Sequence, residues 1–352
     1  MKDRHMSSQA RLLSLATAVP PYVFLQSEVR GRVDRLFDLS AGVDRMLPVF
    51  DNAGIDRRHS CVPMEWYEQP HGWAERNALY VENALSLMEN VALECIANAG
   101  LALDDIDALI VVSTTGIATP SLDALLIERM HLRRDIRRHA IFGLGCGGGV
   151  TGLARAAEAA RSVPGCNVLL LVVELCGLTF RKNDLSKGNI VGTALFSDGA
   201  AGAIVSCEGD GPAFGASGEY TWPDTLDIMG WDIEEDGLKV RFSRNIPAFV
   251  EANLRDPADS FLAANGLSLR DIDGFVFHPG GAKVLTAIET ALELGPEALD
   301  VSRAVLRDYG NMSAATILFV LDATLRGFTG KRLLLSGVGP GFTAGFLVME
   351  TA

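Results

Sequence analysis

The chain has little positive charge and no long apolar run. Its 31 lysines and arginines are outnumbered by 44 aspartates and glutamates, which gives the 352 residues a formal net charge of −13. Nucleic acid needs a basic face for its phosphates, so this charge argues against a nucleic-acid partner. No apolar run reaches the ~18 residues that cross a bilayer, and no secretory signal is evident. We therefore expect a cytoplasmic protein without an integral membrane segment.

Cysteine is sparse and scattered as well. The six cysteines are Cys61, Cys95, Cys146, Cys166, Cys176 and Cys207. No two of them form a CxxC pair, and their spacing lacks the density of a disulfide framework. We therefore expect reduced thiols and no metal site.

The chain is long enough to bury large layers, and it repeats itself. Residues 100–107 read GLALDDID and residues 266–273 read GLSLRDID, an offset of 166 (266 − 100). At nearly the same offset, 165 (311 − 146), the position of Cys146 corresponds to that of Asn311, and each of the two residues precedes a helical run. This pattern predicts an α/β fold of two duplicated βαβ halves on a mostly parallel sheet. We expect a disordered tail over residues 1–10 and the two halves over residues 11–210 and 211–352.

Local patterns predict individual elements within this frame. Strands are expected near residues 11–18, 108–113 and 168–174, and helices over residues 27–50, 73–99 and 150–161. A hairpin-rich stretch is expected over residues 201–240, and the second half should repeat the pattern from residue 246.

Cys146 is the predicted chemical centre. It lies between an apolar stretch and the Ala-rich helical run of residues 151–160. A thiol at such a turn faces unpaired backbone N–H groups and the positive end of the helix dipole, which favours the thiolate and predicts a low pKa. The glycines on both sides let a substrate carbonyl approach the backbone. The alternative is a buried structural thiol beside a tight turn.

His278 and Asn311 complete a candidate constellation. His278 follows the first predicted strand of the second half, and ligands of open α/β sheets bind at the carboxyl ends of strands. An imidazole can hold a thiolate, and an amide N–H can stabilise an oxyanion. The alternatives are a hydrogen-bonded histidine at a strand end and an asparagine that caps a helix.

Five motifs together resemble one family. They are GLGCGG at residues 143–148, ALFSDGAA at 194–201, FHPGG at 277–281, YGNMS at 309–313 and GVGPG at 337–341. Their order and spacing are similar to those of the type III polyketide synthases, relatives of chalcone synthase with the thiolase fold. The resemblance implies a homodimer of layered αβαβα subunits, CoA thioesters as substrates, and no metal or redox cofactor.

The resemblance also implies roles for single residues. Cys146 would accept the starter acyl group, and His278 would sustain its thiolate. His278 and Asn311 would hold the malonyl thioester carbonyl during loss of carbon dioxide. Phe196 resembles the gatekeeper between the CoA tunnel and the cavity, with a core aromatic as the alternative. The other implied substrate contacts are Val240, Cys176, Thr114, Thr119, Thr179, Gly339, Pro340 and Ser313.

Departures from the plant enzymes direct the substrate prediction. Val240 replaces a second gatekeeper phenylalanine, although Phe242 follows two residues later. Cys176 stands in place of a threonine, and Thr119 in place of a methionine that reaches across the dimer. These changes are similar to the bacterial alkylresorcinol and alkylpyrone synthases, which take long acyl starters. The plant lysines that contact CoA are not clearly matched, so Arg57 and Arg58 are the candidate CoA contacts, with the basic run of residues 131–139 as the alternative.

We therefore expect a decarboxylative condensing enzyme. It would load a long acyl starter from CoA or an acyl carrier protein, extend it with malonyl-CoA, and close the chain to an alkylresorcinol or alkylpyrone. The alternatives are a short-starter pyrone synthase, a single-round ketoacyl synthase, a cysteine hydrolase and a catalytically silent binding protein. The hydrolase is considered because the Cys-to-His gap of 132 (278 − 146) falls in the papain-like range of about 130–150.

Overall fold

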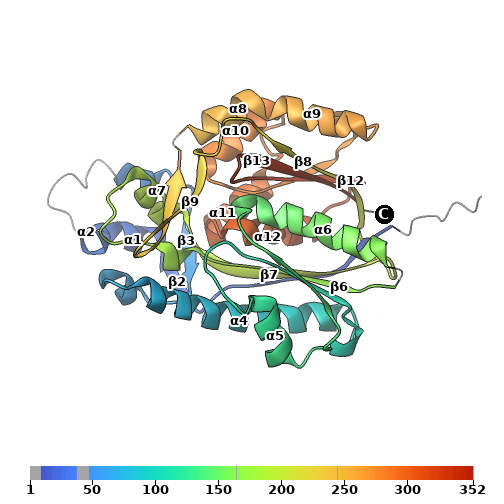
Figure 1. Cartoon of the computed structure of the whole chain (residues 1–352). Coiled ribbons are helices and arrows are strands. Elements are labelled where there is room, and N and C mark those ends of the chain that lie inside the picture. Colours follow the sequence, from blue (N-terminus) through green and yellow to red (C-terminus); the bar gives the residue numbers. More distant parts are fainter. Residues whose placement is uncertain (1–8, 38–46, 164, 244, 352) are drawn as a thin grey trace, which may run out of the picture.

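The computed structural model describes residues 9–37, 47–163, 165–243 and 245–351 (Figure 1). Residues 1–8 of the predicted disordered tail lie outside these ranges. Ala10 is fully buried, and its carbonyl accepts the backbone N–H of Phe214. The ordered chain therefore begins before residue 11, because this segment is held against a strand of the second half.

Five layers stack in the order helix, sheet, helix, sheet, helix (Figure 1), which confirms the predicted αβαβα architecture. Helices α4 and α5 cover one half-sheet, α6 and α12 lie between the half-sheets, and α8, α9 and α10 cover the other. Their bounds are α4 Trp73–Asn98, α5 Leu122–Met130, α6 Gly148–Ser162, α8 Ile246–Asn253, α9 Arg255–Ala264, α10 Ala282–Leu292 and α12 Thr316–Leu325.

The strands of the two half-sheets follow the order β11-β12-β13-β8-β1-β7-β6-β4-β5. Their bounds are β1 Arg11–Ala18, β4 Ala108–Val112, β5 Arg137–Ile141, β6 Val168–Leu175, β7 Asp198–Ser206, β8 Ala213–Thr221, β11 Gly274–Phe277, β12 Arg332–Gly339 and β13 Thr343–Glu350. Strands β1 and β8 are joined at the residue pair Arg11 and Ala213, with flanking backbone hydrogen bonds from Leu12 to Pro212 and from Phe214 to Ala10.

The two halves have the same topology, as the repeat predicts. Strand β4 pairs parallel with β6 across α6, and β11 pairs parallel with β12 across α12. Next in each half comes an antiparallel strand, β7 beside β6 and β13 beside β12. The prediction of a mostly parallel sheet is therefore wrong, because β7 and β13 return antiparallel to the strand that precedes them.

Small residues let the two central helices touch. A Cβ on Gly149 of α6 would lie 2.3 Å from the carbonyl oxygen of Ala314, in the turn before α12. Strand β6 is buried at every position, as its apolar run requires when helices cover both faces. The halves therefore pack around one shared core.

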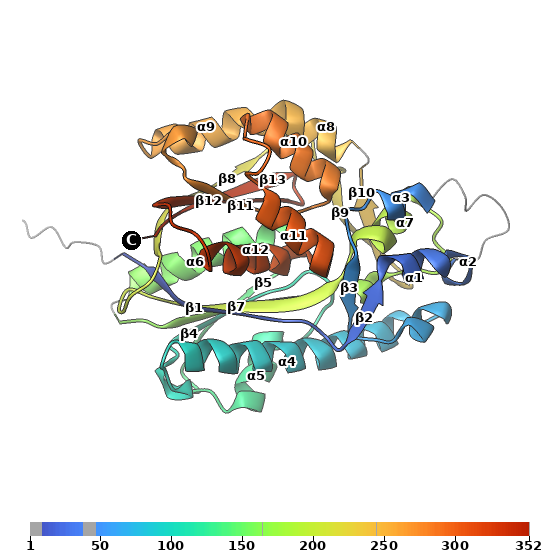
Figure 2. The same cartoon turned by 180° about the vertical axis from the view of Figure 1, so that it is seen from behind.

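A group of shorter elements covers one end of the layers, on the left in Figure 1 and on the right in the reverse view of Figure 2. We call it the end cap. It contains α1 Gln26–Gly31, α2 Val33–Leu36, α3 Leu47–Asp51, α7 Lys187–Leu195, β2 Tyr22–Leu25, β3 Arg57–Ser60, β9 Met229–Glu234 and β10 Gly237–Phe242. Helix α11 (Asp300–Tyr309) packs between α12 and β3.

Most predicted elements lie where the patterns place them, within a few residues. The helix expected over residues 27–50 is the exception, because the structure has three short helices there, and residues 38–46 of that prediction lie outside the described ranges. The stretch of residues 201–240 contains one hairpin, β9–β10. None of the described helices has the length and apolarity to cross a membrane.

Candidate functional site

Cys146 lies in the turn that precedes α6. The chain forms a 3-10 turn over Gly145–Gly147 and continues directly into the helix. The side chain is buried, and its Sγ lies 3.7 Å from Oγ of Ser313, at the matching turn of the second half. Gly145 has φ +46°, and a Cβ there would lie 2.7 Å from Cδ of Pro340. The cysteine turn is therefore held against the loop of residues 337–341.

Gly337 brings His278 close to the cysteine turn. A Cβ on Gly337 would lie 3.2 Å from the carbonyl oxygen of Cys146 and 3.3 Å from Cβ of His278. His278 follows β11, as predicted, and its side chain is buried. Within the described ranges neither ring nitrogen has a hydrogen-bond partner, so the alternative of a hydrogen-bonded histidine is wrong. Buried polar groups are normally paired, so both nitrogens are open to a reacting group.

Asn311 is fully buried, and its amide is fixed in orientation. Oδ1 accepts the backbone N–H of Ser313 at 2.8 Å, and Nδ2 donates to the carbonyl oxygen of Gly280 at 3.3 Å. The amide group carries two N–H donors, and a hydrogen bond from Asn311 opposes the rise of the Cys146 pKa, so the second donor lies at the thiol, where a ligand would bind. Asn311 is not the N-cap of α12, whose N-cap position is Ala315, but its Oδ1 accepts the first N–H of the 3-10 turn that leads into this helix.

Burial controls the charge state of the candidate pair. It raises the pKa of the Cys146 thiol to about 12, and the hydrogen bond to Ser313 opposes the rise only in part. Burial also lowers the pKa of His278 to about 3, so the imidazole is neutral at physiological pH. The predicted low thiol pKa is therefore wrong, because loss of hydration outweighs the helix N-terminus and no charged imidazole balances the thiolate.

Sequence reasoning missed the buried carboxyl group of Glu174. Its Oε2 accepts the backbone N–H of Thr114 at 3.0 Å and the hydroxyl of Thr115 at 2.9 Å, while Oε1 has no partner in the described chain. Burial raises the pKa of this carboxyl to about 7, against hydrogen bonds that include one from Ser313. Thr114 Oγ1 in turn accepts the N–H of Gly145 at 3.2 Å, which links the carboxyl to the cysteine turn. The signal in the sequence was an acidic residue inside the apolar strand VLLLVVEL.

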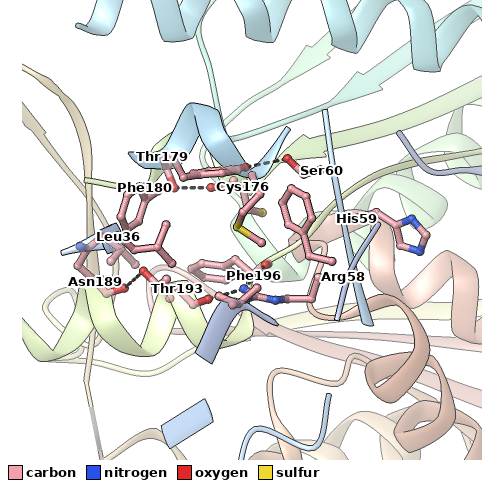
Figure 3. A pocket seen from close by; sticks show the side chains of 17 residues that line it. Leu36, Arg58, His59, Ser60, Cys176, Thr179, Phe180, Asn189, Thr193 and Phe196 are labelled. Carbon is pink, nitrogen blue, oxygen red and sulfur yellow. Dashed lines mark hydrogen bonds between the residues drawn. The ribbon is translucent and has the colours of Figure 1, made fainter. Parts of the chain in front are cut away.

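Four of the predicted substrate contacts line one cavity between the end cap and the sheets (Figure 3). We call it the Phe196 cavity, and its volume is about 60 Å³. The predicted residues on its wall are Phe196, Val240, Cys176 and Thr179. The remaining wall residues are Phe24, Val29, Leu36, Arg58, His59, Ser60, Met64, Tyr67, Gly177, Phe180, Asn189, Gly192 and Thr193.

Several polar side chains of this wall donate their hydrogen bonds to nearby backbone carbonyl groups of the protein. Thr179 Oγ1 donates to the carbonyl oxygen of Cys176 at 2.7 Å, and Thr193 Oγ1 donates to that of Asn189 at 2.7 Å. Asn189 Nδ2 donates to two backbone carbonyls at 2.7 Å each. Dashed lines in Figure 3 mark such bonds between wall residues. The threonine hydroxyls and the Asn189 amide N–H groups of the wall are therefore engaged, and the buried wall atoms without a partner in the described chain are Arg58 Nε and His59 Nδ1.

A second, larger cavity opens on the other side of Phe196. We call it the Lys283 cavity, and its volume is about 540 Å³. It reaches Gly280, which binds Asn311, and its wall includes Lys187, Lys283 and Phe242. The ring of Phe242 meets that of Phe196 edge-on, with centroids 6.4 Å apart. Two aromatic rings therefore separate the cavities.

Comparison with known proteins identifies the family. The N-terminal domain of "Chalcone and stilbene synthases" matches residues 2–209, and the C-terminal domain matches residues 216–351. The chain belongs to the chalcone and stilbene synthase family. It is a type III polyketide synthase, an acyltransferase of the condensing class, so the hydrolase and silent-binder alternatives are wrong.

The relatives cover between about three quarters and nearly all of the synthase. It is 38% identical to a 1,3,6,8-tetrahydroxynaphthalene synthase of Streptomyces peucetius subsp. caesius, over 99% of this chain and 96% of the relative. It is 34% identical to type III polyketide synthase C of Arabidopsis thaliana, over 73% of this chain and 71% of the relative. The crystal structure of 1,3,6,8-tetrahydroxynaphthalene synthase from Streptomyces coelicolor A3(2), a bacterial type III polyketide synthase, superimposes with TM-score 0.92 at 31% identity, covering 97% of this chain and 99% of that one.

The synthase places the other predicted contacts in separate surroundings. Gly339 and Pro340 lie against the cysteine turn, and a Cβ on Gly339 would lie 2.3 Å from the carbonyl oxygen of Leu144. Thr119 is exposed, away from both cavities.

The two predicted CoA contacts are engaged with the protein. Arg57 forms an ion pair with Asp308 at 3.4 Å. Arg58 is buried and donates from Nη1 to the backbone carbonyls of Thr193 and Phe196. Neither arginine lines the Lys283 cavity, whose cations are Lys187 and Lys283. CoA binding by Arg57 and Arg58 stays a prediction.

Proposed function

We propose that this synthase joins a long-chain acyl starter to malonyl units and cyclises the product to an alkylresorcinol or alkylpyrone. The observation that carries the proposal is the Phe196 cavity, whose apolar wall offers few free hydrogen-bonding groups. A hydrocarbon chain needs no such partner and gains about 0.8 kcal/mol for each buried CH₂. A charged or polar occupant would lose its hydration without replacement.

Loading begins at Cys146. As Sγ attacks the thioester carbon of the acyl-CoA, His278 takes the thiol proton, the carbon–sulfur bond to CoA breaks, and His278 gives that proton to the departing CoA thiolate. Before substrate binds, burial leaves the thiol protonated and the imidazole neutral, so the ring has a nitrogen that can accept the proton.

Extension uses the second half of the chain. When malonyl-CoA loses carbon dioxide, the electron pair of the broken bond forms an enolate, and its oxygen needs hydrogen-bond donors. The second N–H of Asn311 and a ring nitrogen of His278 supply them. The enolate carbon then attacks the acyl–Cys146 carbonyl, a carbon–carbon bond forms, and the Cys146 thiolate leaves.

The Lys283 cavity suits the CoA moiety of both substrates. Lys187 and Lys283 form no ion pair with any described residue, although this chain carries a net charge of −13. Two unpaired cations at one cavity are what a polyphosphate group requires. The nearby bond from Asn311 to Gly280 places the cavity next to the enolate-stabilising amide. An acyl carrier protein remains the alternative carrier of the starter.

We also propose a homodimer that forms along β5, the edge strand of the first half-sheet. Strand β5 pairs only with β4 among the described strands. Phe142, just after β5, is 57% exposed, and Ile117 is 42% exposed beside Thr119. An exposed edge with large apolar side chains is a typical site of association between copies. Analytical ultracentrifugation should give twice the monomer mass, and Phe142→Glu should lower it.

A second candidate is a naphthol synthase that uses malonyl units alone. It is favoured by the 38% identity to the 1,3,6,8-tetrahydroxynaphthalene synthase of Streptomyces peucetius. The two candidates differ in the starter, so a product profile separates them.

The test is mass spectrometry of products from acetyl-, hexanoyl- and palmitoyl-CoA with malonyl-CoA, and from malonyl-CoA alone. We expect alkylated pyrones or resorcinols, with palmitoyl-CoA preferred. Cys176→Phe and Val240→Phe should obstruct the cavity and reduce turnover of the long starter while the short ones still fit. Release of a naphthol from malonyl-CoA alone, with no product from palmitoyl-CoA, would favour the second candidate.

A further inference from the structure

None of the candidate catalytic residues lines the Phe196 cavity, but Phe196 on its wall pairs with Asn311 through a β-bridge. Another part of the wall is built by Val29 in α1, Leu36 in α2 and Met64 in the 3-10 turn Met64–Glu68, which follows β3 of the end cap in the sequence. We call these three residues the cap wall. Resting on the proposed function, we infer that the cap wall is the subsite for the methyl end of the acyl starter and sets the chain length that the synthase accepts.

The cap wall is apolar and buried. Val29 and Leu36 are each 3% exposed, and Met64 is 7% exposed. All three belong to the core that packs between α4 and the first half-sheet, so they face the cavity from a fixed framework. Methionine adapts to irregular space, which suits a wall that meets chain ends of several lengths.

Aromatic rings reinforce this part of the cavity. The ring of Tyr67 meets those of Phe24 and Phe180 edge-on, with centroids 6.1 Å and 5.8 Å apart. The hydroxyl of Tyr67 pairs with that of Ser60 at 2.8 Å. The one polar atom of this aromatic cluster is therefore occupied, and the rings offer carbon surface to a ligand.

Charge in the cavity does not favour an acidic chain end. The charged wall residue is Arg58, whose Nη1 is bonded to the carbonyls of Thr193 and Phe196 and whose Nε is buried without a partner among the described residues. In Figure 3 Arg58 lies beside Phe196, and Leu36 lies on the opposite side of the view. A carboxylate against the cap wall would therefore have no counter-charge there, whereas a terminal methyl group needs none.

The chain offers a matched control for the cap wall. Val29 and Val33 lie four residues apart on the adjacent helices α1 and α2, and each is 3% exposed. Val29 lines the cavity and Val33 does not. A substitution at either position disturbs the same core, but only the one at Val29 changes the space for the starter.

The experiment compares Val29→Phe with Val33→Phe in the full-length synthase. Products and the acyl adduct of Cys146 are measured by mass spectrometry with hexanoyl-, dodecanoyl- and palmitoyl-CoA. We expect Val29→Phe to lower kcat/KM for palmitoyl-CoA by about fourfold for each excluded methylene, with hexanoyl-CoA within about twofold of the wild type. Val33→Phe should leave the ratio of long to short starters unchanged.

A second pair covers the case in which phenylalanine prevents folding. Val29→Ala should shift the preference toward longer starters. Val33→Ala should lower the thermal unfolding temperature about as much as Val29→Ala does, but without that shift in preference. Equal profiles for the two positions, with palmitoyl-CoA still used by the wild type, would overturn the inference and leave the proposed function intact. A wild type that loads no long starter at all would overturn both.

Discussion

The two halves of this synthase share one topology but contribute different chemistry. Each half places a buried helix after a 3-10 turn, α6 after Gly145–Gly147 and α12 after Ser313–Ala315. The first half supplies a thiol at its turn. The second supplies the imidazole after β11 and the amide of Asn311. A duplicated frame therefore divides the candidate nucleophile and the candidate carbonyl-binding groups between two copies of one motif.

The halves also differ in strands and in a buried charge. The first half has the extra edge strand β5, which has no counterpart beyond β11. When β6 is aligned with β12 at an offset of 164 (332 − 168), the position of buried Glu174 in the first half corresponds to that of Val338 in the second. Among the described residues, the first half thus has one more strand at its outer edge, and it carries a buried ionisable group that the second half lacks at the matching place.

The largest effect should come from removing the thiol of the first half. Cys146→Ala should reduce polyketide formation to the detection limit, because no other group accepts the starter. Intact-protein mass spectrometry should then show no acyl adduct. Cys176→Ala is the control, since its thiol is also fully buried near the site and it should still load. An adduct on Cys61, Cys95 or Cys176 would contradict the assignment.

Single substitutions of Asn311 and His278 in the second half should affect loading and extension differently. Asn311→Ala should still load starter on Cys146 but lose about 10²- to 10³-fold in extension, the usual effect of one missing oxyanion donor. His278→Ala should slow both loading and extension, because it serves both steps. Single-turnover loading and steady-state product formation measure the two steps separately. The reverse pattern would show that the two roles are exchanged.

The buried charge of the first half should make stability depend on pH. The pKa of Glu174 rises from its ordinary value of 4.5 to about 7 on burial, so the folded state binds this proton more tightly than the unfolded state. Its contribution is complete below about pH 4.5 and is lost as pH rises through about 7. Glu174→Gln should therefore gain stability relative to the wild type between pH 5 and pH 8, on the order of 3 kcal/mol at most. Urea unfolding at pH 5 and at pH 8 measures the difference in unfolding free energy between Glu174→Gln and the wild type. An equal difference at both pH values would show that the titration of Glu174 is not its cause.

A smaller effect should follow from separating the halves at the contact between their central helices. Gly149→Ala places a Cβ against the carbonyl of Ala314 and the side chain of Ile317, at 2.3 Å and 2.5 Å. Overpacking of this kind costs about 1–3 kcal/mol. Gly327→Ala is the control, since nothing lies within 4 Å of its Cβ position. Denaturant unfolding should rank the two variants in this order, and similar stability would argue against a tight contact between α6 and the second half.

Features that depend on short stretches of sequence could be predicted. The apolar run of β6, the long periodic helix α4 and the repeat over residues 100–107 and 266–273 led directly to the layered fold. Cys146, His278 and Asn311 could be selected because each stands in a distinctive glycine-rich or turn motif.

Features that depend on tertiary surroundings could not be predicted. The direction of the Cys146 pKa follows from burial by residues distant in the chain. Lys187 and Lys283 come to line one cavity only because the fold brings α7 and α10 to its wall. Helix α1 ends early although the pattern continues, because the end cap packs short segments around a cavity rather than along a sheet.

The apolar wall of the Phe196 cavity, with its hydroxyl and amide groups bonded within the protein, has a consequence for the composition of the proposed product. A wall with few free donors distinguishes acyl groups by length and bulk, and only weakly by branching or unsaturation, since about fourfold per methylene is all that apolar contact provides. Starters of similar length then compete by abundance. The side chains of the product would follow the acyl-CoA supply of the cell, so a shift in fatty-acid synthesis, for example with growth temperature, would appear in the polyketide without any change in the enzyme.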